Sequence, residues 1–127
     1  MIIAIDWDGT ITEDPALFAL FMATARGGKH TPIIVTQRNE EQGKDILEYV
    51  DYVKNDLNIT IPIVWAGGMT KMDAVTNAGY TVDVWVDNNP IGVYVAMMYG
   101  GDTLEEYEED PDKYYYKHLD GVGDGSE

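Results

Sequence analysis

Apolar residues in this chain occur in short continuous runs that alternate with longer amphipathic segments. Residues 2–5, Ile-Ile-Ala-Ile, contain no polar alternation, which predicts a strand covered on both faces, as in a parallel sheet. Similar apolar runs predict strands at residues 31–36, 59–65 and 81–86. Pro62 favours an edge position for the third of these strands, because proline has no N–H to donate to a neighbouring strand.

Helices are predicted between these strands. Asp14 and Pro15 form a typical helix start, a capping carboxylate followed by proline in the first turn, for a helix over residues 16–26. That helix is apolar nearly all round, so we expect it to be buried on more than one side or to cover a partner. Asn39 and Gln42 form a capping box that predicts the next helix. Further helices are predicted at residues 71–77, 91–98 and 103–107.

The alternation of strands and helices predicts the fold class. A β-α-β-α order favours an α/β, three-layer Rossmann-like fold with a parallel sheet and right-handed crossovers. At 127 residues, the chain has the length of one domain. We expect this domain to cover residues 1–101, and residues 102–127 to form an acidic C-terminal segment that is partly disordered or packed on the domain.

Composition narrows the classes of function. The formal net charge is −15, and about half of the excess lies in residues 101–127. Because such a surface repels phosphate backbones, binding of long nucleic acid is not expected. The absence of cysteine excludes disulfides, thiolate metal sites and a cysteine nucleophile. No apolar run approaches the ~20 residues of a membrane span, and no signal segment is recognised, so we expect a cytoplasmic location without membrane partners.

Two aspartates that follow the first strand are the strongest indication of chemistry. Asp6 and Asp8 are expected to point to the same side of an extended backbone, which suits a shared metal ion. Gly9 allows a sharp turn over the site, and Thr10 can hydrogen-bond back across it. An acidic turn after a buried strand is the alternative, although buried carboxylates are costly without a cation or hydrogen-bond donors.

The sequence Asp-Trp-Asp-Gly-Thr at residues 6–10 resembles the first motif of the haloacid dehalogenase (HAD) superfamily, Asp-x-Asp-Gly-Thr after a hydrophobic strand. The resemblance implies that Asp6 attacks a phosphoryl group and that Asp8 serves as general acid and base. It also implies that both aspartates hold Mg²⁺, Asp8 through its backbone carbonyl. Gly9 and Thr10 are then candidate substrate-binding residues at the turn over the site.

Three later residues match the remaining motifs of the superfamily in chain order, so the resemblance spans about residues 1–92. Thr36 matches a Ser or Thr that hydrogen-bonds the transferred phosphoryl group. Lys71 matches a lysine that offsets charge on that group and orders the nucleophile; a solvated lysine in the first turn of a helix is the alternative. Asp87 matches the acid that completes the Mg²⁺ shell.

Two neighbouring positions leave alternatives open. Arg38 either adds a bidentate contact to the phosphoryl group, as a substrate-binding residue, or faces solvent before a helix. Many members of the superfamily carry a second acid next to or shortly after the first acid of the last motif, where this chain has Asn88 and Asn89. The side-chain amide of either residue can orient a metal-bound water without binding the metal directly, and Asn88 is the candidate for this role.

The intervals between the motifs are too short to hold a cap domain, so the resemblance implies a capless phosphatase with an open site. The expected function is Mg²⁺-dependent hydrolysis of a phosphomonoester through an aspartyl-phosphate. The substrate is a phosphorylated small molecule or an exposed phosphate on a larger one. One alternative is a nucleotide or polynucleotide-end (3′-) phosphatase. Another is a HAD-like protein-binding module with weak or lost activity, and the apolar helix at residues 16–26 makes homo-oligomerisation a further hypothesis.

Overall fold

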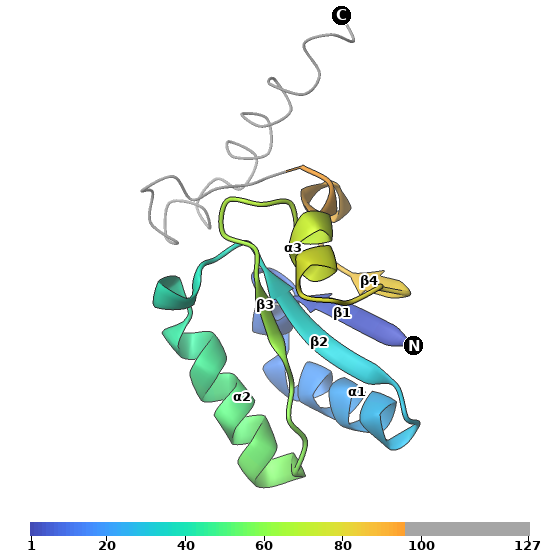
Figure 1. Cartoon of the computed structure of the whole chain (residues 1–127). Coiled ribbons are helices and arrows are strands. Elements are labelled where there is room, and N and C mark those ends of the chain that lie inside the picture. Colours follow the sequence, from blue (N-terminus) through green and yellow to red (C-terminus); the bar gives the residue numbers. More distant parts are fainter. Residues whose placement is uncertain (96–127) are drawn as a thin grey trace, which may run out of the picture.

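Four parallel strands form one sheet in the order β3-β2-β1-β4 (Figure 1). The computed structural model describes residues 1–95, so the predicted helix at 103–107 and the predicted segment 102–127 lie outside the described residues. The strands are β1 (Ile2–Asp6), β2 (Thr31–Thr36), β3 (Ile63–Trp65) and β4 (Val84–Val86). The α-helices are α1 (Pro15–Gly27), α2 (Lys44–Leu57) and α3 (Lys71–Asn77). Short 3-10 helices are η1 (Ile11–Glu13), η2 (Glu40–Gln42) and η3 (Pro90–Val93).

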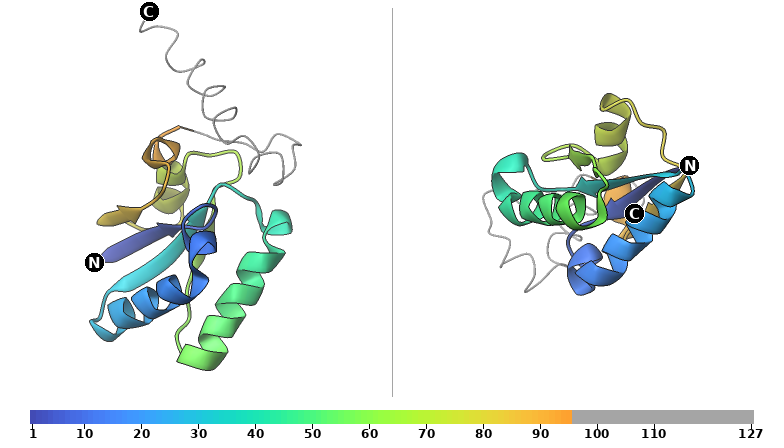
Figure 2. Two further views of the ribbon diagram at one scale, coloured as in Figure 1. Left: turned by 180° about the vertical axis from the view of Figure 1, so that it is seen from behind. Right: turned by 90° about the horizontal axis from the view of Figure 1, so that it is seen from below.

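Helices cover both faces of the sheet, as expected for an α/β protein. α1 and α2 lie on one face and α3 lies on the other (Figure 2). Ile3 and Ile5 of β1 pack in the cluster that contains residues of α1 and α2, whereas Ala4 packs in the cluster that contains residues of α3. This burial on both faces confirms the prediction for residues 2–5 and explains their lack of polar alternation.

The order of the strands reverses at β1. β2 and β3 lie on one side of β1 and β4 lies on the other, so that Ile3 aligns with Pro32 in one direction and with Val84 in the other. β3 is an edge strand, as Pro62 predicted. In open parallel sheets, the crevice at the carboxyl ends of the strands beside such a reversal is the usual position of a ligand site.

β3 and β4 are shorter than the predicted strands at residues 59–65 and 81–86. Asn58 ends α2 in the left-handed conformation (φ 57°), and Pro62 has no N–H to extend the pairing of β3. On the other side of the sheet, the N–H of Ile2 donates to the side chain of Asp83 at 2.8 Å. A side chain thus takes a position in the ladder that the backbone would occupy in a longer β4.

The capping box at Asn39 and Gln42 is present, but it caps η2 and not α2. α2 begins one residue after Gly43, where a Cβ atom would overlap the ring of Trp65. The predicted helix at residues 91–98 is a 3-10 helix over Pro90–Val93 in its described part, and residues 96–98 lie outside it.

α1 begins at the predicted cap, since the carboxylate of Asp14 accepts a hydrogen bond from the N–H of Leu17 at 3.1 Å. The expectation that α1 is buried on more than one side is wrong: Leu17 and Leu20 are 55% and 62% exposed. Its buried residues all lie toward the sheet and are Ala19, Met22 and Ala25. None of the helices in residues 1–95 combines the length and the apolar character that a bilayer crossing requires.

Candidate functional site

The four predicted motifs meet at the carboxyl edge of the sheet, beside the reversal of strand order. Asp6 ends β1, Thr36 ends β2, Asp87 follows β4 and Lys71 opens α3. All four of these side chains are buried or nearly so. Because parallel strands end on the same side of the sheet, positions far apart in sequence come together here: Lys71 contacts Asp6, 65 residues before it, and Asp87, 16 residues after it.

Lys71 bridges two carboxylates in this site. Its ammonium Nζ donates to Asp6 Oδ1 and to Asp87 Oδ2, each at 2.7 Å. The side chain is 3% exposed, so the alternative of a solvated lysine is wrong. Burial lowers the pKa of Lys71, but the two carboxylates outweigh this effect and the pKa is raised. Lys71 is therefore a fixed cation between two acids.

Asp6 is held from two sides. Lys71 binds one carboxylate oxygen, and the hydroxyl of Thr10 donates to the other at 3.2 Å. Burial raises the pKa of Asp6 to about 7, against the opposing attraction of Lys71 and with the help of the nearby charge of Asp87. Hydrogen bonds at both oxygens leave the Asp6 carboxylate in one orientation at the end of β1.

The turn after β1 contacts the loop after β4. Gly9 has φ +80°, and a Cβ atom there would collide with the side-chain amide of Asn88. The N–H of Asn88 donates to Thr10 Oγ1 at 3.2 Å, and the N–H of Asn89 donates to Asp87 Oδ1 at 2.9 Å. Asn88 thus lies against the turn at residues 9–10, next to Asp6 and Asp87.

Replacing Gly9 by alanine is expected to lower the free energy of unfolding by about 1–3 kcal/mol, because a Cβ atom at this positive φ is strained and collides with Asn88. Urea titration of the purified variant measures this difference. Gly27→Ala is the matched control, since no atom outside its own turn of α1 lies within 4 Å of the added Cβ and alanine favours a helix. Equal stabilities of the two variants would contradict the structural role of Gly9.

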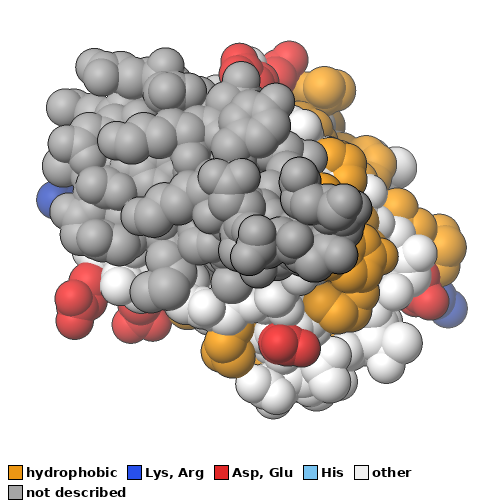
Figure 3. All heavy atoms as spheres, turned by 90° about the horizontal axis from the view of Figure 1, so that it is seen from above, with side chains coloured by type: hydrophobic (Ala, Val, Ile, Leu, Met, Phe, Trp, Pro, Cys, Tyr) orange, Lys and Arg blue, Asp and Glu red, His pale blue; other side chains and the backbone are white. Residues whose placement is uncertain are grey.

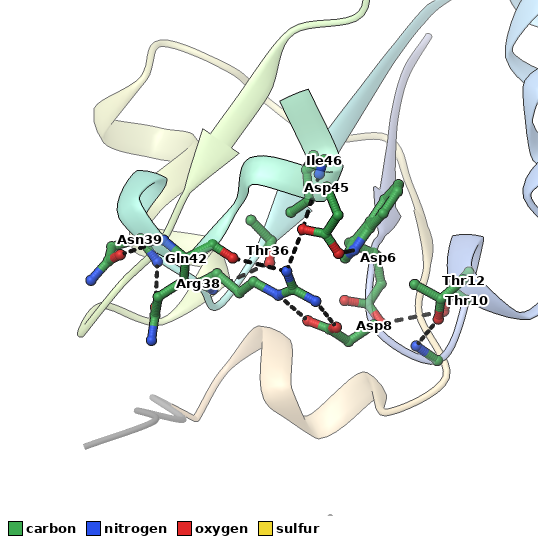
Figure 4. Close-up of polar contacts among 12 residues, drawn as sticks. Asp6, Asp8, Thr10, Thr12, Thr36, Arg38, Asn39, Gln42, Asp45 and Ile46 are labelled. Atoms are coloured by element: carbon green, nitrogen blue, oxygen red, sulfur yellow. Dashed lines mark hydrogen bonds and ion pairs between the residues drawn. The ribbon is translucent and has the colours of Figure 1, made fainter. Parts of the chain in front are cut away.

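Arg38 lies inside the site and binds Asp8 with two nitrogens (Figure 4). Its Nε donates to Asp8 Oδ2 at 3.1 Å and its Nη2 donates to Asp8 Oδ1 at 2.6 Å. Arg38 is 2% exposed, so the alternative of a solvent-facing arginine is wrong. A bidentate arginine–carboxylate pair is geometrically specific, and here it fixes the plane of the Asp8 carboxylate.

Thr36 is fully buried, and its Oγ1 accepts a hydrogen bond from the N–H of Arg38 at 3.2 Å. Arg38 also contacts Asp45, an acid that was not among the site residues predicted from sequence. Asp45 Oδ1 accepts a hydrogen bond from Arg38 Nη1 at 2.7 Å. In the sequence, Asp45 is one of 23 acidic residues, and its position in the first turn of a helix has an ordinary explanation in the helix dipole.

The oxygen donors at this edge suit Mg²⁺, although residues 1–95 contain no cluster of three His, Cys, Asp or Glu side chains that could by itself hold a metal ion. The reason is visible in the contacts: the Asp8 carboxylate turns to Arg38, and Lys71 bridges Asp6 and Asp87. The ammonium of Lys71 already joins the carboxylates of Asp6 and Asp87. Mg²⁺ needs few protein oxygens, because it keeps several waters. The carboxylates of Asp6 and Asp87 are therefore of the oxygen-donor type that this ion takes.

Comparisons with known proteins add no relative to this description: no family model, no curated protein and no solved structure is significantly similar to the chain.

Proposed function

We propose that this protein is a Mg²⁺-dependent phosphomonoester hydrolase of the capless HAD type, which acts through an aspartyl-phosphate on Asp6. The observation that carries the proposal is the buried ammonium of Lys71, 2.7 Å from both Asp6 and Asp87 at the reversal of strand order. Two buried acids joined by one buried base are costly to build, and such clusters of coupled ionisable groups gather at functional sites.

In the first step, a carboxylate oxygen of Asp6 attacks phosphorus in line with the ester oxygen. The new bond between Asp6 and phosphorus forms as the ester bond breaks. In this step Asp8 is protonated on Oδ2, stays held at Oδ1 by Arg38 Nη2, and gives its proton to the leaving oxygen. Thr36 at the end of β2 and Lys71 at the start of α3 donate hydrogen bonds to the phosphoryl oxygens. Most of the acceleration comes from this positioning and charge stabilisation.

In the second step, water attacks the phosphorus of the aspartyl-phosphate. Asp8, now ionised, takes a proton from that water, the bond between Asp6 and phosphorus breaks, and inorganic phosphate leaves. Asp6 returns as a carboxylate and Asp8 as an acid, so the cycle closes. Mg²⁺, held by Asp6, Asp87 and the carbonyl of Asp8, would supply positive charge that offsets the phosphoryl oxygens.

The connections between the site elements support a capless form of this enzyme. Only η1 lies between β1 and α1, and only η2, α2 and β3 lie between β2 and α3. Where the described residues are visible on the face seen from above, the basic side chains lie at its margins and acidic side chains lie around it (Figure 3). The formal net charge of −15 favours a small phosphomonoester over a long polyanion.

Turnover is expected to depend on Mg²⁺. We expect p-nitrophenyl phosphate to be hydrolysed with Mg²⁺ present and the rate to fall by about a hundredfold or more with excess EDTA, because the charge of the phosphoryl group is then less well offset. Release of p-nitrophenolate measures the rate, and added Mg²⁺ should restore it. If metal-replete protein turns over neither this ester nor a panel of sugar phosphates, nucleotides and 3′-phosphorylated oligonucleotides, the proposed function is wrong.

A further inference from the structure

Asp45 joins two separate parts of the proposed site. It lies in the first turn of α2, and its two carboxylate oxygens have different partners. Oδ1 accepts a hydrogen bond from Arg38 Nη1 at 2.7 Å, and Oδ2 accepts one from Trp7 Nε1 at 3.3 Å. Figure 4 shows Asp45 above the guanidinium, with Asp8 on the opposite side of it.

The first connection leads through Arg38 to the side chain of Asp8. A guanidinium is planar, so the partners of one nitrogen set the direction in which the others point. The Nη1 of Arg38 is held by Asp45 at 2.7 Å and by the carbonyl of Gln42 at 2.9 Å. With that edge fixed, Nε and Nη2 can meet the Asp8 carboxylate in one orientation only.

The second connection leads to the backbone of the same loop. Trp7 is the residue between the two proposed catalytic aspartates, and it is 5% exposed. Its ring packs edge-on against Tyr49, with 5.1 Å between the ring centroids. The hydrogen bond from Trp7 to Asp45 fixes the ring at its polar end. Asp45 therefore restrains Asp8 in two ways: Arg38 holds the Asp8 side chain, and Trp7 holds the backbone next to Asp8.

Stability gives little reason for this arrangement. The side chain of Asp45 is 51% exposed, and an ion pair with a partner that exposed contributes little to folding. Asp45 and Arg38 line an open cavity of about 380 Å³, together with Glu41, Gln42, Lys44 and Glu48. Glu48 lies in the same helix and lines the same cavity, but its side chain makes no hydrogen bond or ion pair within residues 1–95. Asp45 thus differs from its acidic neighbours in what it holds.

We propose that Asp45 is a positioning residue for Asp8. It holds the guanidinium of Arg38, and through it the Asp8 carboxylate, in the orientation needed for proton transfer to the leaving oxygen. This inference rests on the proposed hydrolase function. It also gives Arg38 the role of orienting Asp8, in place of the substrate contact expected from sequence.

The test compares Asp45→Asn with Glu48→Gln on two substrates, p-nitrophenyl phosphate and an alkyl phosphate. An alkoxide leaving group needs a proton from Asp8, whereas p-nitrophenolate needs little help. We expect Asp45→Asn to lower kcat for the alkyl phosphate about tenfold or more, the usual effect of losing a residue that orients a functional group. The loss for p-nitrophenyl phosphate should be smaller, and KM should change less than about threefold for both esters. Glu48→Gln should match the wild type.

A double mutant separates this role from a general effect on the fold. If Asp45 acts mainly through Arg38, Asp45→Asn should lower kcat much less in an Arg38→Gln background than in the wild type, because only its contact with Trp7 is then left to lose. Equal losses in both backgrounds, a rise in KM without a fall in kcat, or Asp45→Asn kinetics equal to those of Glu48→Gln would each overturn the positioning role while the hydrolase function stands. A wild-type protein inactive on all phosphomonoesters would instead overturn the proposed function and this inference with it.

Discussion

Replacing Asp6 by asparagine is expected to reduce phosphomonoester turnover on the order of 10⁴-fold or more, because an amide cannot form the aspartyl-phosphate. The protein should still fold, since asparagine has nearly the same shape and Lys71 keeps its second partner, Asp87, at 2.7 Å. Steady-state rates with saturating Mg²⁺ measure the loss. Acid quenching during turnover, followed by mass spectrometry, should detect one added phosphoryl group on the wild type and none on Asp6→Asn.

The control for this experiment is Asp51→Asn, which removes an exposed carboxylate of α2. Its activity is expected to equal that of the wild type, because Asp51 takes no part in the described site. An Asp6→Asn variant that keeps the wild-type rate would contradict covalent catalysis by Asp6. A wild type that turns over without any phosphorylated intermediate, and without loss in Asp6→Asn, would point to direct attack by water.

Lys71→Met is expected to lower the free energy of unfolding by about 3–5 kcal/mol in metal-free buffer. The reason is that Asp6 and Asp87 would remain buried without the ammonium that joins them, and an uncompensated buried charge is strongly destabilising. Mg²⁺ should stabilise this variant more than it stabilises the wild type, because the ion then supplies the positive charge that the variant lacks. Thermal or urea unfolding with and without Mg²⁺ measures both effects.

Lys54→Met is the matched control, since Lys54 is an exposed lysine of α2. Its unfolding free energy is expected to stay within about 0.5 kcal/mol of the wild type, with or without Mg²⁺. If Lys71→Met is as stable as Lys54→Met, the buried ion cluster has no structural weight. If Mg²⁺ stabilises neither the variant nor the wild type, the carboxylates of Asp6 and Asp87 do not form a magnesium site.

The parts of the fold that could be predicted from sequence are those with a local cause. The apolar run at residues 2–5 predicted a doubly buried strand, and Ile3, Ala4 and Ile5 are buried. The cap at Asp14 predicted the start of α1, because a carboxylate before a helix meets the same free N–H groups in any fold. The ends of β3 and β4 were less predictable, because strand length depends on a partner strand that is distant in sequence.

The side-chain partners in the site depended on tertiary structure. Lys71 and Arg38 each had a solvent-exposed alternative at the level of sequence, and both are buried against carboxylates. The local sequence around a lysine at a helix start is the same whether the lysine faces solvent or contacts two acids that are distant in sequence. Asp45 illustrates the same limit, because its contacts come from packing the start of α2 beside the turn after β1 and the loop after β2.

The sequence alone determined which residues stand at the ends of the predicted strands and helices, including Asp6, Thr36, Lys71 and Asp87, because hydrophobic period and capping act over a few neighbouring residues. Only the tertiary structure decided which of these charges meet. Parallel strand order brings Asp6 and Asp87 to the same edge from opposite ends of the described chain. Electrostatic pairing then depends on distances of a few ångströms that no local pattern encodes.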